Sequence, residues 1–209
     1  MATHIAARLP EDSTAAPTLA NRIHVLLIER RVAISMVLFT LLVLVDLFVM
    51  RTRPRNVLNV ADPLVATGLA LLLSGLLVRS WAAGTLRKVK ELVTIGPYAM
   101  VRNPLYVGTF LMMAGFCTLL ADPLMLAFVV GPTVVLYWLA VRDEEQVLAR
   151  FFPDEWPAYA ARVPRFVPRL KLPTADGWSL AQWRKNHEHN AWLGASVALV
   201  GLWIWSVCG

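Results

Sequence analysis

Long uninterrupted runs of apolar residues constrain this chain more than any other feature of its sequence. A helix needs roughly 20 residues to cross about 30 Å of hydrocarbon. Five runs approach that length, at about residues 32–50, 64–82, 105–121, 124–141 and 191–207. Only 16% of the residues are charged, whereas a soluble domain carries about a quarter. We therefore predict an all-α, polytopic integral membrane bundle of about five transmembrane helices.

The rest of the sequence predicts a short tail and one domain. Residues 1–31 are expected to form an N-terminal tail, which the distribution of basic residues places in the cytoplasm. Residues 1–20 lack the apolar core of a cleavable signal. Residues 32–209 form a single membrane domain. Within it, residues 142–190 are amphipathic, rich in proline and too polar to cross lipid. We expect this segment to lie as a cap on the cytoplasmic membrane face.

Basic residues orient the predicted bundle. Four of them lie between the second and third runs: Arg87, Lys88, Lys90 and Arg102. More follow in 142–190, whereas the tip between the third and fourth runs, at Asp122, carries none. The positive-inside rule places both basic segments in the cytoplasm, as expected for a bacterial inner-membrane protein. Arg51, Arg53 and Arg55 conflict with this rule, because they fall in a loop assigned to the outside.

The overall charge does not require a nucleic-acid partner. The formal net charge is +6, but basic residues beside apolar runs are the ordinary pattern of membrane proteins. The expected partners are membrane lipids and a lipid-like substrate, with no nucleic acid.

Two polar clusters are expected to meet at one membrane face. Arg102-Asn103-Pro104 comes directly before the third run, and Arg142 to Glu145 follows the fourth. The two runs are joined by a tight hairpin, so two helices of similar length return the chain to the face from which it started. The sequence therefore predicts a site for a zwitterionic or cationic ligand at the membrane boundary.

The residues of these clusters resemble a known family. Gly96-Pro97-Tyr98, followed by Arg102-Asn103-Pro104-Leu105-Tyr106-Val107-Gly108, is similar to the GPY…RHPxYxG element of the isoprenylcysteine carboxyl methyltransferases. A second element of that family, EExxL…FGxxYxxY…VPRF, is similar to the segment from Glu144 to Phe166. Together the two elements span about residues 79–170. The resemblance implies a membrane methyltransferase that binds S-adenosyl-L-methionine between the two elements, under a cytoplasmic lid.

The resemblance also implies roles for individual residues. The cofactor-binding candidates are Tyr98, Arg102, Asn103, Pro104, Tyr106, Glu144 and Glu145. Glu145 is expected to hold the ammonium or ribose of the cofactor, and it is a catalytic candidate together with Arg79. The family has an Arg before the GPY element, and Arg79 lies at about that place in this chain. The resemblance therefore implies that Arg79 engages the carboxylate of the acceptor. Asn103 departs from the family, which has His there, so a hydrogen-bonding role is retained and a proton-accepting role is not.

Simpler interpretations stand beside these roles. Glu144 and Glu145 can be the solvated end of a helix, and Tyr98 and Tyr106 can be membrane-interface residues. Pro97, Pro104 and Gly108 can serve helix initiation and packing. Asp46, inside the first run, is expected to pair within the bundle. No metal site is predicted, because His187 and His189, two apart on a helix, would point in opposite directions.

These observations favour an S-adenosyl-L-methionine-dependent methyltransferase acting on a lipid-like acceptor. The favoured acceptor is the carboxylate of an isoprenylcysteine-type or related isoprenoid substrate. Three alternatives remain: methylation of a phospholipid amine or a thiol, an NADPH-dependent reductase of the membrane sterol type, and a non-catalytic membrane scaffold.

Overall fold

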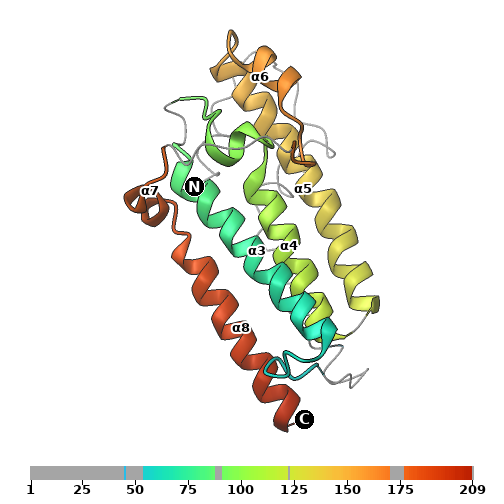
Figure 1. Ribbon diagram of the computed structural model, residues 1–209. Helices are drawn as coiled ribbons and strands as arrows, with labels where there is room; N and C mark the ends of the chain where they lie inside the picture. The colour runs from blue at the N-terminus through green and yellow to red at the C-terminus, as the bar shows by residue number, and fades with distance from the viewer. Residues whose placement is uncertain (1–44, 46–53, 88–90, 122, 170–176, 209) are drawn as a thin grey trace, which may run out of the picture.

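The fold is a bundle of helices, seen in a computed structural model that describes residues 45, 54–87, 91–121, 123–169 and 177–208 (Figure 1). The elements are α3 (Pro63–Thr85), the short 3-10 helix η3 (Gly96–Ala99), α4 (Pro104–Leu120), α5 (Pro123–Phe151), α6 (Trp156–Arg162), α7 (Leu180–Lys185) and α8 (His189–Cys208). The described residues contain no strand. The all-α prediction is therefore confirmed for this part of the chain.

Prolines start three of the long helices. Pro63, Pro104 and Pro123 each begin a helix, where a missing N–H costs nothing and the fixed φ already suits helix geometry. At α3, the Asp62 side chain also accepts a hydrogen bond from Leu64 N at 2.9 Å. Helices α3, α4 and α8 match the predicted runs to within a few residues, whereas α5 is longer than the run predicted at 124–141. That helix continues unbroken through Arg142 and Glu145 to Phe151.

Paired glycines bring α3 and α4 into backbone contact. Gly75 faces Gly108, and Gly68 faces Gly115. A Cβ atom on Gly75 would lie 2.5 Å from the Gly108 carbonyl oxygen, and one on Gly115 would lie 2.6 Å from the Gly68 oxygen. Small residues allow such close approach between helices in a membrane. The packing role expected for Gly108 is thus confirmed.

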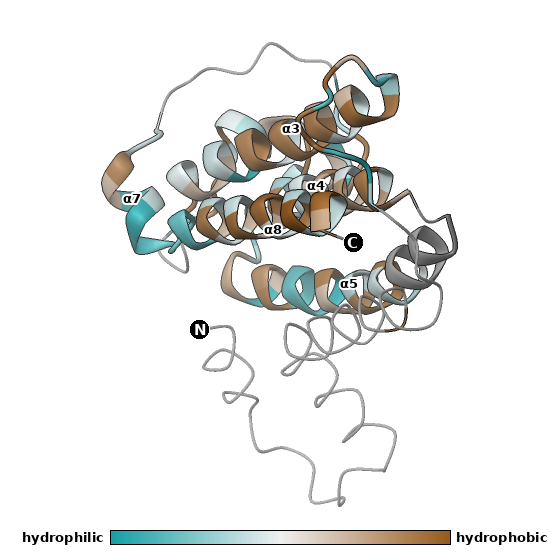
Figure 2. Cartoon of the chain, turned by 90° about the horizontal axis from the view of Figure 1, so that it is seen from below, coloured by the Kyte–Doolittle hydropathy of each residue, from teal (hydrophilic) through white to brown (hydrophobic). Residues whose placement is uncertain are grey.

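Among the described residues, two helices, α3 and α8, are long and apolar enough to cross a membrane. Apolar side chains on α8 are exposed along much of its length: Leu193, Val197, Val200, Trp203, Ile204 and Val207. Figure 2 shows the largely hydrophobic colouring of this helix. An apolar surface of this extent is unusual on a soluble monomer and indicates contact with lipid. Helix α4 is apolar but only 17 residues long. The protein is therefore membrane-associated, and the arrangement of five spans stays a prediction.

Several predictions from the sequence lie outside the described residues. These are the tail at 1–31, nearly all of the first run at 32–50 with Asp46, the loop residues Arg51 and Arg53, and the hairpin tip at Asp122.

Residues 152–169 and 177–188 lie at the end of the bundle at which α3 ends and α4 begins, which is called the polar end (Figure 1). Backbone hydrogen bonds join Arg102 N to Pro164 O at 2.8 Å and Arg169 N to Met100 O at 3.1 Å. On the other side, Asn186 Nδ2 donates to Ala83 O at 2.7 Å, near the end of α3. These bonds hold the loop after α6 and the α7–α8 junction against the helix ends.

Candidate functional site

The two polar clusters expected to meet do so at the polar end. Arg102, just before α4, lies 3.2 Å from Glu145 of α5, measured from Nη1 to Oε2. The residues are 43 positions apart (145 − 102), and the α4–α5 hairpin returns them to one place. This part of the site prediction is confirmed.

Glu145 is the centre of this outer cluster, which comprises Asn103, Arg102, Glu145 and Arg165. It is buried, with 7% of its surface exposed. Arg165 Nη2 donates to Glu145 Oε2 at 2.6 Å and Arg165 Nε donates to Oε1 at 3.0 Å. These hydrogen bonds raise the pKa of Arg165. The Glu145 carboxylate is thus already held by arginines, and a cofactor ammonium at this position would have to share it.

Asn103 fits the outer cluster as a hydrogen-bond donor. Its Nδ2 donates to Glu145 Oε1 at 3.2 Å and to the Arg165 carbonyl oxygen at 3.3 Å. Pro104 follows as the first residue of α4 and is fully buried. An amide at this position therefore links the start of α4 to the second motif without needing to take up a proton.

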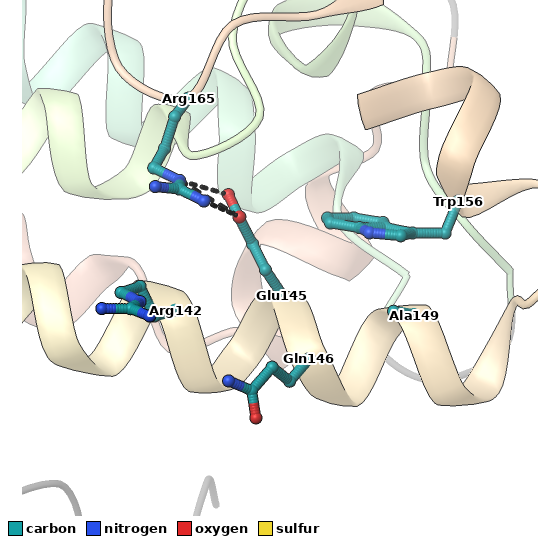
Figure 3. Close-up of a pocket in the computed structure, with 6 residues that line it drawn as sticks. All are labelled: Arg142, Glu145, Gln146, Ala149, Trp156 and Arg165. Atoms are coloured by element: carbon teal, nitrogen blue, oxygen red, sulfur yellow. Dashed lines mark hydrogen bonds and ion pairs between the residues drawn. The ribbon is translucent and has the colours of Figure 1, made fainter. Parts of the chain in front are cut away.

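A pocket of about 280 Å³ opens beside the outer cluster (Figure 3). Its lining residues are Arg142, Glu145, Gln146, Ala149, Trp156 and Arg165. The Arg102 guanidinium lies 5.9 Å from the centre of the Trp156 ring, within cation–π range. The arginines outnumber the carboxylate here, so the pocket suits an anionic group beside an aromatic ring.

Arg142, Gln146, Trp156 and Arg165 had no predicted role. Trp156 and Arg165 both lie in the second motif, so the motif itself was the available signal. Arg142 lies three residues before Glu145 on α5, and Gln146 lies one residue after it. Helical spacing alone could have placed Arg142 near the Glu145 face.

A second, inner cluster lies at the ends of α3 and α8. Arg79 donates from Nε and Nη2 to the two oxygens of Glu188 at 2.9 and 3.0 Å, and from Nη1 to Thr109 Oγ1 at 2.6 Å. Glu188 is only 3% exposed. No feature of the sequence predicted the pairing of Arg79 with Glu188. Arg79, expected to meet an acceptor carboxylate, already binds one that belongs to the protein.

The backbone at His187 corrects one argument from the sequence. His187 lies before α8 with φ of 57°, and its ring centre lies 5.9 Å from that of His189. The assumption that both residues sit on one helix and point apart is wrong.

The tyrosines of the two motifs contact other motif residues. Tyr106 donates its hydroxyl to Glu144 Oε1 at 3.0 Å and packs edge-on against Tyr137. Tyr159 donates to the Tyr98 carbonyl oxygen at 2.9 Å. Tyr98 is 7% exposed, and burial raises the pKa of its phenol far above the usual range. Glu144 is therefore a partner of Tyr106 in this structure and not merely a solvated helix end.

Comparisons with known proteins agree with the two motifs. Residues 60–155 match the family model described as phospholipid methyltransferase. The human protein-S-isoprenylcysteine O-methyltransferase is 38% identical over 85 residues, covering 38% of this chain and 28% of that protein. The resemblance inferred from the motifs is thus confirmed.

Other relatives carry names from metal resistance. The nickel-cobalt-cadmium resistance protein NccN of Alcaligenes xylosoxydans xylosoxydans is 34% identical over 117 residues, covering 54% of each chain. This chain therefore spans about half the length of that relative. No solved structure matches the chain.

Proposed function

We propose that this chain, whose residues 60–155 match the phospholipid methyltransferase family, is an integral membrane methyltransferase that uses S-adenosyl-L-methionine and acts on a lipid-like acceptor. The observation that carries the proposal is the meeting of both motifs around Glu145, beside a pocket at the polar end. The site lies where a soluble cofactor and a membrane lipid can reach the same residues.

The outer cluster suits the cofactor. Arg142 and Arg165 line the pocket and can bind the carboxylate of its methionyl group, since guanidinium groups pair well with carboxylates. Arg102 Nε is buried without a partner among the described residues and can add a donor. Trp156 offers an aromatic face. When bound, S-adenosyl-L-methionine supplies an electrophilic methyl group on a sulfonium.

The chain's own residues would align the reactants and exclude water. A carboxylate acceptor is already a nucleophile near neutral pH, so it needs orientation and not a base. Charge is neutralised as the methyl moves from sulfonium to carboxylate, and a low dielectric favours that step. Arg79, on the inner cluster, keeps N–H groups beyond those given to Glu188 and Thr109. The carboxylate of an isoprenoid acid is therefore the first acceptor candidate.

A phospholipid amine is the second candidate, and the Arg79–Glu188 pair favours it. A free buried cation would oppose a developing ammonium, but Glu188 balances the Arg79 charge in this structure. An amine also needs a base to take its proton.

The orientation completes the proposal. Five spans, with the polar end in the cytoplasm of a bacterial inner membrane, would place the pocket where S-adenosyl-L-methionine is made and lipids are in reach. The basic residues around the polar end support this orientation.

Methyl transfer can be tested with labelled cofactor. Purified protein incubated with methyl-labelled S-adenosyl-L-methionine and total membrane lipid should give a labelled lipid, identified as ester, amine or thioether by mass spectrometry. Calorimetry on the same sample should show cofactor binding and no binding of NADPH. Binding of NADPH alone would support the reductase alternative, and binding of neither would support a scaffold.

Arg79 should affect the acceptor more than the cofactor. Arg79→Lys is expected to lower turnover about 10-fold, because an ammonium cannot reproduce the bidentate pairing of a planar guanidinium. Cofactor affinity should change less than about twofold. The matched control is Arg87→Lys, since Arg87 pairs with Glu91 on the surface and its change should be silent.

Arg79→Ala should lower turnover further. This variant also leaves Glu188 as a buried carboxylate without its cation, so the unfolding temperature must be measured on the same samples. Full turnover in Arg79→Ala would reduce the residue to a structural anchor and favour the amine acceptor.

A further inference from the structure

The Tyr98 side chain holds a buried hydroxyl without a partner. Its oxygen has no hydrogen bond within the described part of the chain, although the residue is only 7% exposed. Buried hydroxyls are nearly always hydrogen-bonded, so an exception calls for an explanation such as a missing ligand. The neighbouring Tyr159 hydroxyl, by contrast, has a partner, because it donates to the Tyr98 carbonyl oxygen.

The position of Tyr98 relates this hydroxyl to the inner cluster. Tyr98 belongs to a buried apolar cluster with Ala82 of α3, and Leu105 of α4 packs against this cluster. Ala82 is three residues after Arg79, and Leu105 is four residues before Thr109, so each pair shares one helix face. Thr109 Oγ1 also donates to the Leu105 carbonyl oxygen at 2.9 Å. Tyr98 therefore lies one helical turn from the Arg79–Thr109 contact.

The chemistry of the hydroxyl at this position is that of a donor. Burial, with Tyr159, Glu144 and Glu188 nearby, raises the pKa of Tyr98 far above neutrality, so its proton is retained at physiological pH. The Arg79 guanidinium has five N–H groups, and three are engaged by Glu188 and Thr109. Counting only bonds to the described residues, two N–H groups of Arg79 and the O–H of Tyr98 thus remain as donors.

We propose that the Tyr98 hydroxyl and the remaining Arg79 N–H groups form the headgroup site of the acceptor, where Tyr98 donates a hydrogen bond to a carboxylate oxygen. The assignment rests on the proposed function and moves Tyr98 from the cofactor to the acceptor. Glu188 acts as a positioning residue, because its two oxygens fix one edge of the guanidinium and leave the rest of it available.

The test compares two tyrosine variants with opposite expectations. Tyr98→Phe removes a hydroxyl that makes no hydrogen bond with the described residues, so its unfolding temperature should equal or exceed that of the wild type. Tyr159→Phe, the control, removes a hydroxyl that is bonded to Tyr98 O and should unfold at a lower temperature. The binding probe is N-acetyl-S-farnesylcysteine, measured by the rise in unfolding temperature in detergent. The methyl ester of the probe serves as its uncharged counterpart.

Tyr98→Phe should need about 3- to 10-fold more of the acid for half-maximal stabilisation, the factor expected for one lost hydrogen bond. Tyr159→Phe should need the same amount of the acid as the wild type. For S-adenosyl-L-methionine, both variants should need the same amount as the wild type. Unchanged probe binding in Tyr98→Phe, a loss confined to the cofactor, or no binding of the acid by the wild type would each overturn the assignment. Probe binding as expected without any methyl transfer would refute the proposed function and leave this site intact.

Discussion

Replacing Glu145 with Gln should destabilise the polar end by about 3 kcal/mol, near the lower limit for breaking a buried ion pair. The lower limit applies because Glu145 is buried but the Arg165 side chain is 31% exposed and can regain water. The substitution leaves Arg102 and Arg165 without their shared carboxylate while keeping the size of the side chain. Cofactor affinity should fall at least about 10-fold, because Arg102 and Arg165 lose the carboxylate that holds their guanidinium groups in place.

Glu144→Gln is the matched control for this prediction. Glu144 is the preceding residue on α5, and Tyr106 donates to it at 3.0 Å. Losing the charge there should cost about 1 kcal/mol, as for an ordinary hydrogen bond. Thermal unfolding in detergent and calorimetric titration with S-adenosyl-L-methionine measure both effects. Small and equal effects in the two variants would show that Glu144 and Glu145 form only a solvated helix end.

Gly75→Ala should lower stability by about 2–3 kcal/mol, the upper part of the usual range for overpacking. The new Cβ would lie 2.5 Å from the Gly108 carbonyl oxygen and 2.8 Å from Met112 N. Both atoms belong to the α4 backbone, so no side chain can rotate away to make room. Helices α3 and α4 must then separate. The separation should also shift Arg79 of α3, because its side chain packs closely on α4: a Cβ at Gly108 would lie 2.5 Å from Arg79 Cγ.

Gly201→Ala provides the comparison for the glycine prediction. A Cβ at Gly201 of α8 would meet nothing within 4 Å, and Ala favours a helix over Gly. This variant should unfold at the same temperature as the wild type or above it. If Gly75→Ala were as stable as Gly201→Ala, the α3–α4 contact would be looser than described, and the position of Arg79 would not depend on it.

The helices and the outer cluster were predictable because they follow from local features. Apolar runs and the prolines at 63 and 104 mark the helices and their starts. The short connection between α4 and α5 requires Arg102 and Glu145 to return to the same end. The glycine pairs also carried a signal, since Gly68 and Gly75, like Gly108 and Gly115, are seven residues apart and share a helix face.

The inner cluster was not predictable in the same way. Arg79 and Glu188 are 109 residues apart, and no spacing rule relates positions so distant. The carboxylate that binds Arg79 depends on how α8 packs beside α3, which is a property of tertiary packing. His187 shows the same limit on a smaller scale, because its left-handed backbone changes the direction of a side chain that helical spacing had assigned.

The long separation between Arg79 and Glu188 also has a consequence for biosynthesis. The ribosome must add 109 residues after Arg79 before the carboxylate that neutralises it exists. During that interval Arg79 lacks its carboxylate partner, so the end of α3 that carries it should stay in contact with water or lipid headgroups. The Arg79 guanidinium gains its counter-charge only when α8 packs beside α3, where Trp192 Nε1 donates to Ser80 Oγ at 2.7 Å. The proposed acceptor site would thus be among the last parts of the molecule to mature, and a chain truncated before residue 188 would insert without it.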